Sequence, residues 1–148
     1  MGTGTGTGTG DEGQGGASPA RTVPLTIQAD RPEAALHLVA TPIGAARDIT
    51  LRALDVLNAA DVLAAEDTRN LRHLLDIHGI PVRGRRLIAY HDHNADRTRP
   101  AILAALREGL SVAYASDAGT PLVADPGYRL ARDVAEAGLT AVSYTHLR

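Results

Sequence analysis

The sequence predicts an α/β protein in which a parallel five-stranded sheet carries helices on both faces and follows a disordered N-terminal tail. Short apolar runs alternate with longer segments whose leucines recur every three or four residues, a pattern typical of strands and amphipathic helices. The order strand then helix occurs four times before a last strand. Strands joined by crossover helices have few packings other than a parallel sheet.

Residues 1–34 are expected to be a disordered, low-complexity tail. They open with a Gly-Thr repeat and contain few large apolar side chains, so burial cannot offset the entropy lost on ordering. No apolar run there resembles a signal peptide, and none in the chain approaches the roughly 20 residues that cross a bilayer. We therefore expect a cytoplasmic protein without a membrane partner.

The first strand is expected over residues 36–40, where an apolar run leads into the tight turn Thr41-Pro-Ile-Gly44. A helix capped by Asp48 should follow and reach Asn58, because leucines recur there at helical spacing. Residues 61–65 form another short apolar run and predict the second strand.

The second helix follows the polar segment Glu66-Asp-Thr-Arg69. It is expected to end at Gly79, because glycine readily adopts the left-handed conformation that closes helices. Residues 87–90 predict the third strand and residues 91–94 a polar turn.

A third helix is expected over residues 99–107, before a fourth strand over residues 112–115. The last unit is a helix over residues 128–137 and a strand over residues 139–142. These elements complete a single α/β domain over residues 35–142.

Polar segments follow the first four predicted strands. In parallel sheets, ligands bind beyond the carboxyl ends of the strands, so we expect these segments to gather at one edge. They are Thr41-Pro-Ile-Gly44, Glu66-Asp-Thr-Arg69, His91-Asp-His-Asn94 and residues 116–127.

The longest of these segments, residues 116–127, has the composition of a ligand-binding loop. Its glycines let backbone approach a bound molecule, and its prolines restrict the chain before binding. Asp117 and Asp125 supply acceptors for hydroxyl groups or cations. The alternative is a rigid turn in which these carboxylates cap backbone amides, and the residues alone leave both interpretations open.

Glu66, Asp67 and Arg69 allow two interpretations. They could provide a general base and a substrate clamp, or a helix N-terminus in which acidic residues favour the helix dipole. The helix N-terminus alone would explain Glu66 and Asp67, and their position beside the other polar segments makes the functional interpretation equally open.

Several common sites are absent or disfavoured. The turn after the first strand lacks the G-x-G-x-x-G spacing of dinucleotide sites, and the chain has no lysine for a P-loop and no cysteine for a disulfide or thiol nucleophile. The formal net charge of −2 disfavours wholesale coating of nucleic acid. His91 and His93 could ligate a metal, but turn capping is the commoner role, and we expect no metal.

Several motifs together resemble the small-subunit ribosomal RNA methyltransferase I family, within the tetrapyrrole-methylase-like, class III methyltransferases. The resemblance covers about residues 36–139 and implies the first domain of the tetrapyrrole methylase fold. The motifs are Leu38-Val-Ala-Thr-Pro-Ile-Gly44, Asp48-Ile-Thr-Leu-Arg-Ala-Leu54, Ala64-Ala-Glu-Asp-Thr-Arg69, Tyr90-His-Asp-His-Asn94, Ser116-Asp-Ala-Gly-Thr-Pro121 and Asp125-Pro-Gly-Tyr128.

The resemblance implies methyl transfer from S-adenosylmethionine to the ribose 2′-hydroxyl of a cytidine in small-subunit (16S) ribosomal RNA. Such a reaction needs a base for a weakly acidic hydroxyl, and Glu66, Asp67 and His91 are unranked candidates. Arg69 and His93 are the expected substrate-binding residues. Cofactor contacts are expected at Pro42, Gly44, Asp117, Ala118, Gly119, Thr120 and Pro121.

Members of the resembled family continue into a second α/β domain and bind the cofactor between the two domains. Here the resemblance stops near Val142, so we expect residues 143–148 to be a tail outside the family pattern, the second domain to be absent and the chain alone to be inactive. The resemblance also implies a homodimer in the intact protein and the small ribosomal subunit as partner. Methylation of a tetrapyrrole precursor and a non-catalytic ligand-binding fragment are the alternatives.

Overall fold

The computed structural model describes residues 2, 4, 32–42, 48–117 and 126–144. Within these ranges strands and helices alternate along the chain, as the sequence predicts. Most of the expected tail lies outside the described residues. The elements are β1 (Leu36–Thr41), α1 (Leu51–Ala59), β2 (Val62–Ala65), α2 (Thr68–Ile77), β3 (Arg86–Ala89), α3 (Ala95–Arg107), β4 (Val112–Asp117), α4 (Pro126–Glu136) and β5 (Ala141–Tyr144).

The five strands form one sheet in the order β3-β2-β4-β1-β5, and every neighbouring pair is parallel. The predicted parallel five-stranded sheet is confirmed. In the centre of the sheet, Leu36 of β1 lies opposite Val112 of β4, and Thr41 lies opposite Asp117. Because all strands point in one direction, their carboxyl ends meet at one edge, here called the carboxyl edge, and their starts at the amino edge.

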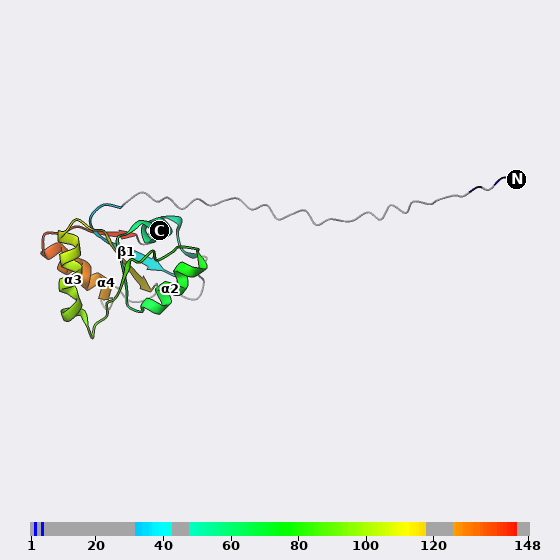
Figure 1. Ribbon diagram of the computed structural model, residues 1–148. Coiled ribbons are helices and arrows are strands. Elements are labelled where there is room, and N and C mark those ends of the chain that lie inside the picture. The colour runs from blue at the N-terminus through cyan, green and yellow to red at the C-terminus, as the bar shows by residue number, and fades with distance from the viewer. Residues whose placement is uncertain (1, 3, 5–31, 43–47, 118–125, 145–148) are drawn as a thin grey trace.

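Helices cover both faces of the sheet, as predicted. Side chains alternate between faces along a strand, so Val39 and Leu63 join a core with α1 and α2, whereas Leu36 and Val62 join a core with α3 and α4. Figure 1 shows α3 and α4 on one side of the sheet and α2 on the other. Two apolar cores therefore hold the sheet, and the strand ends at its edges remain available for polar groups.

The cap of α1 differs from the prediction. Thr50, not Asp48, precedes the helix in an extended conformation (φ −75°, ψ 152°), and its hydroxyl oxygen accepts a hydrogen bond from the Ala53 amide at 3.0 Å. This contact satisfies one of the free amides of the first helical turn. Because Asp48 lies two residues further upstream, it does not occupy the capping position.

Several other elements also begin or end away from their predicted positions, and four of them differ by two residues or more. α3 begins at Ala95 rather than residue 99, and α4 begins at Pro126 rather than residue 128. Proline suits the first helical position, because its fixed φ is helical and the amide it lacks has no partner there. β4 extends to Asp117, and β5 covers residues 141–144 rather than 139–142.

Gly79 ends α2 as predicted. Its φ of 68° is left-handed, its amide donates to the Asp76 carbonyl at 3.1 Å, and the Ile80 amide donates to the Leu75 carbonyl at 2.9 Å. These two bonds form a Schellman motif, which satisfies carbonyl groups at the helix end. The chain thereby turns toward β3 at the amino edge.

Arg85 joins several chain segments at the amino edge. Its guanidinium approaches the carbonyl end of α1, where carbonyl oxygens lack helical partners. A charged donor makes stronger hydrogen bonds than a neutral one, so Arg85 closes the end of this helix and orders the approach to β3. Its acceptors are the carbonyls of Leu57 (2.7 Å), Asn58 (3.2 Å), Ala60 (2.9 Å), Pro81 (2.8 Å) and Val82 (2.9 Å).

We predict that Arg85→Ala lowers the free energy of unfolding by about 2–4 kcal/mol, because several partly buried carbonyls lose their donor. Chemical denaturation followed by circular dichroism measures this change. Arg132→Ala, which removes an exposed arginine of α4, is the matched control and should change stability by less than about 0.5 kcal/mol. Equal effects of the two substitutions would contradict the assigned role of Arg85.

Candidate functional site

The exits of β1 and β4 lie side by side at the carboxyl edge. Thr41 and Asp117 are partners in the parallel register, and the Thr41 hydroxyl donates to the Ser116 carbonyl at 2.9 Å. The chain therefore leaves both strands from neighbouring points. This arrangement agrees with the predicted gathering of polar segments at one edge.

The expected cofactor-binding residues are only partly described. Pro42 is half-buried directly after β1, and the backbone of Asp117 ends β4 beside Thr41. The other expected contacts lie outside the described residues, so their roles stay predictions. They are Gly44, Ala118, Gly119, Thr120 and Pro121.

Asp67 is the N-cap of α2, at the exit of β2. One carboxylate oxygen accepts a hydrogen bond from the Arg69 amide at 2.9 Å, and the Arg69 side chain approaches the carboxylate at 3.3 Å. The hydrogen bond from the Arg69 side chain lowers the pKa of Asp67. A carboxylate held in this way is a weaker base. Asp67 therefore has the capping role that one of the two interpretations gave to this segment. Glu66, next to Asp67, is exposed.

The turn at the exit of β3 is fastened by Asn94. Its side-chain oxygen accepts from the His91 amide at 2.8 Å, and its side-chain nitrogen donates to the Ala89 carbonyl at 2.9 Å. The rings of His91 and His93 lie edge to face, with centroids 5.9 Å apart. The side chain of Asn94 thus fixes the backbone from which His91 projects, and makes no cap bond to α3.

His91 and His93 differ in their surroundings. His93 is exposed, whereas His91 is half-buried, and its Nδ1 atom is buried without a hydrogen-bond partner in the described part of the chain. No group of three or more potential metal ligands occurs within residues 32–42, 48–117 and 126–144. His91 therefore remains a candidate for proton transfer to or from a bound molecule.

The ion pair between Asp92 and Arg129 joins the turn after β3 to α4. Because α4 begins at Pro126, this contact holds the turn near the start of the last described helix. The exits of β2, β3 and β4 and the start of α4 thus belong to one edge of the molecule. The sequence analysis did not predict the ion pair between Asp92 and Arg129, because residues so far apart along the chain carry no local signal of their pairing.

Tyr90 and Tyr114 are buried beside each other near the carboxyl edge. The Tyr114 hydroxyl donates to the Tyr90 carbonyl at 3.1 Å, and the two rings lie edge to face at 6.0 Å. Burial raises the pKa of Tyr90, so its phenol stays neutral.

Arg99 of α3 pairs with Asp133 of α4 at 2.8 Å. Strand alternation places Tyr114 on the face of Val112, whereas the ion pair has no signal in the sequence.

Among the described residues, no helix is both long enough and apolar enough to cross a membrane.

The chain is similar to known methyltransferases. The profile of the family described as Tetrapyrrole (Corrin/Porphyrin) Methylases matches residues 35–144. Ribosomal RNA small subunit methyltransferase I of Mesorhizobium japonicum is 58% identical over 110 residues, which are 74% of this chain and 36% of that protein. The proteins of the same name from Escherichia coli O157:H7 and Neisseria meningitidis serogroup B are 51% and 50% identical, over 77% and 72% of this chain.

The aligned segments make up only part of each relative. They cover 39% of the Escherichia coli protein and 36% of the Neisseria meningitidis protein. The chain therefore matches little more than a third of the length of these curated relatives.

We predict that the carboxyl group of Asp67 titrates below its ordinary pKa and that Arg69→Ala raises this pKa, because the charged partner is removed. The pair stabilises the fold fully above the ordinary carboxyl pKa, and this stabilisation is lost as the pH falls through the lowered value. Carboxyl carbon chemical shifts measured by NMR report the titration. Arg72→Ala is the control and should leave the curve in place. An unchanged Asp67 titration in Arg69→Ala would show that the pair is absent in solution.

Proposed function

Because the chain belongs to the tetrapyrrole (corrin/porphyrin) methylase family, we propose that it forms the methyl-donor side of a methyltransferase acting on small-subunit ribosomal RNA. The single observation that carries this proposal is the set of relatives named ribosomal RNA small subunit methyltransferase I, at 50–58% identity over 72–77% of the chain. The register of Thr41 with Asp117 supports it, because the two expected donor-binding turns leave the sheet from neighbouring strands.

The residues of the carboxyl edge suit S-adenosylmethionine. When bound, this molecule supplies an electrophilic methyl group on sulfur. Its ammonium, carboxylate and ribose hydroxyl groups need hydrogen-bonding partners but no phosphate site, which agrees with a chain that lacks lysine. Asp117 would accept hydrogen bonds from hydroxyl or ammonium groups, and Pro42, Gly44 and residues 118–121 would line the donor with backbone.

Within this proposal, the acceptor is the 2′-hydroxyl of a cytidine in small-subunit (16S) ribosomal RNA. A hydroxyl is a poor acid, so its attack on a methyl group requires alignment and removal of a proton. We assign proton removal to His91, because the Nδ1 atom of its imidazole has no hydrogen-bond partner among the described residues. Asp67 is less suitable, since Arg69 holds its carboxylate and lowers its pKa.

The proposed activity belongs to a protein of the same length as the curated relatives. We propose that this protein is a homodimer in the cytoplasm and binds its substrate RNA within the small ribosomal subunit. Methylation of a tetrapyrrole precursor is the second candidate, because the matching family is described by tetrapyrrole methylases. The names of the curated relatives favour the RNA substrate.

We predict that Asp117→Ala weakens S-adenosylmethionine binding by about tenfold or more, because a hydrogen bond to a charged group contributes about 1.5–3 kcal/mol. Isothermal titration calorimetry with the full chain measures the affinity. Glu108→Ala is the matched control, since it removes an exposed carboxylate at the amino edge, and should bind the donor as the unaltered chain does. An Asp117→Ala chain with unchanged affinity would remove Asp117 from the site.

A chimera tests the substrate and the base. Residues 35–144 of this chain replace the aligned segment of the Escherichia coli relative, and labelled methyl transfer to small subunits that lack the modification is measured. We expect the chimera to transfer the methyl group. Its His91→Ala variant should transfer it about 100-fold or more slowly, because the general base is gone, and should bind the donor with unchanged affinity. Full activity of this variant would exclude His91 as the base, and transfer to a tetrapyrrole precursor alone would refute the RNA substrate.

A further inference from the structure

The outward face of α2 carries a polar hollow that the proposed donor site does not use. The opposite face of the helix packs into the core through Leu71, Leu74 and Leu75. The hollow has a volume of about 400 Å³ and opens to solvent. It is lined by Thr68, Arg69, Arg72, His73 and Asp76.

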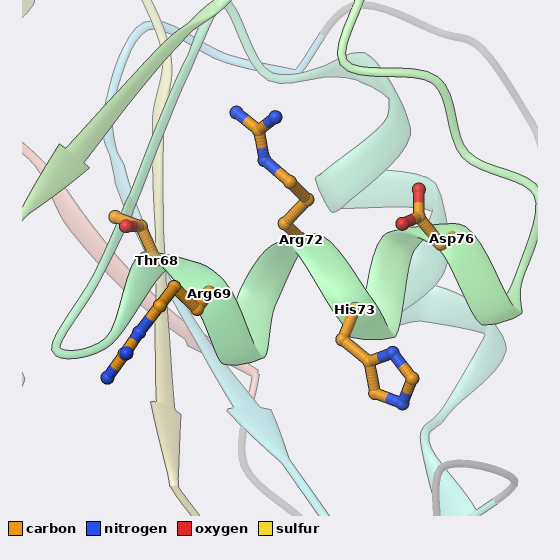
Figure 2. A pocket seen from close by; sticks show the side chains of 5 residues that line it. All are labelled: Thr68, Arg69, Arg72, His73 and Asp76. Carbon is orange, nitrogen blue, oxygen red and sulfur yellow. The ribbon is translucent and has the colours of Figure 1, made fainter.

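The side chains of this hollow form two rows along the helix. Figure 2 shows Arg72 and Asp76 leaving one side of α2, and Arg69 and His73 leaving the other. Residues four apart in a helix lie one above the other, so each row presents one arginine. Asp76 lies at the end of its row that is furthest from the carboxyl edge, about 10 Å along the axis from Arg69.

The two arginines differ in their partners. Arg69 is paired with Asp67, but its side chain is 91% exposed, and such a surface pair opens at little cost. Arg72 is exposed and forms no ion pair within the described ranges. The part of the hollow nearest the carboxyl edge therefore presents arginine side chains that are free to bind an anion. This local positive charge contrasts with the net charge of −2 of the chain.

We propose that this hollow binds backbone phosphate groups of the RNA strand beside the target nucleotide. The assignment rests on the proposed function, because α2 begins immediately after the exit of β2 at the carboxyl edge. A strand whose ribose reaches that edge would pass the first two turns of α2. The planar guanidinium of arginine matches phosphate oxygens in a two-point contact, and the Thr68 hydroxyl adds a donor.

Contacts of this kind position a nucleic acid without reading its sequence. Arg72 would make the main phosphate contact, Arg69 would contribute after it leaves Asp67, and Asp76 would repel a strand that continued along the helix. The hollow thereby favours one path for the strand, from the carboxyl edge across the start of α2. An acidic protein surface is the competing partner, and the test below separates the two.

Binding of a fluorescent single-stranded RNA of about 12 nucleotides to the full chain tests the proposal by anisotropy, at salt concentrations between about 50 and 200 mM. We expect Arg72→Ala to weaken binding about fivefold at the lowest salt. The slope of log affinity against log salt should become shallower by about 0.7, the value for one contact with a single strand. Asp76→Asn should bind the RNA more tightly, because it removes a repulsive charge.

Arg107→Ala is the matched control. It removes an exposed arginine in the last turn of α3, at the amino edge and on the opposite face of the sheet, and should leave the salt slope unchanged. Equal slopes in the two arginine variants, or absence of RNA binding, would overturn the proposal. Displacement of the RNA by polyglutamate at the same concentration of charge would also overturn it, in favour of an acidic protein partner.

A titration of each variant with S-adenosylmethionine separates this inference from the proposed function. If Arg72→Ala retains the RNA affinity and salt slope of the unaltered chain while the donor binds, the hollow is not the RNA surface and the proposed function stands. If the donor does not bind the unaltered chain but the salt slope changes as expected, the proposed donor site fails and the RNA surface is supported.

Discussion

The parallel pairing of β1 with β4 is the constraint on which the arrangement of the candidate site depends. These strands are remote in sequence but adjacent in the sheet, and their register places Thr41 opposite Asp117. Because side chains alternate between the faces of a sheet, a slip by one residue would exchange the two faces and disrupt both cores. The hydrophobic pattern that stabilises the fold thus also brings the two expected donor-binding turns together.

Polar contacts are divided between the two edges of the sheet. At the amino edge they close the structure: Arg85 binds carbonyls at the end of α1, and Asp61 and Ser111 exchange hydrogen bonds between the starts of β2 and β4. At the carboxyl edge, Asn94 and the pair of Asp92 with Arg129 hold turns in place, while Arg72 and His91 Nδ1 lack partners among the described residues. At the carboxyl edge, Arg72 and the imidazole of His91 are therefore available for a ligand beside turns that are held in place.

Much of this architecture could be predicted from the sequence, because local hydrophobic periodicity indicates the alternation of strands and helices. The parallel sheet and the expected gathering of polar segments at one edge follow from it, and the closure of α2 follows from the left-handed conformation that Gly79 adopts. The insertion of β4 between β1 and β2 could not be predicted, since the sequence alone does not say which strands pair. Asp and Thr both cap helices well, so local sequence did not distinguish Asp48 from Thr50, which is the cap in the structure. The partner of Asp92 depended on the packing of α4.

Amide chemical shifts during a titration with S-adenosylmethionine test most directly whether the carboxyl edge holds a methyl donor. We expect the amides of Thr41, Ser116 and Asp117 to shift together with one affinity, while those of Arg85 and Ser111 at the amino edge stay in place. Shifts confined to the amino edge, or an unperturbed Ser116 and Asp117 at saturating donor, would contradict it.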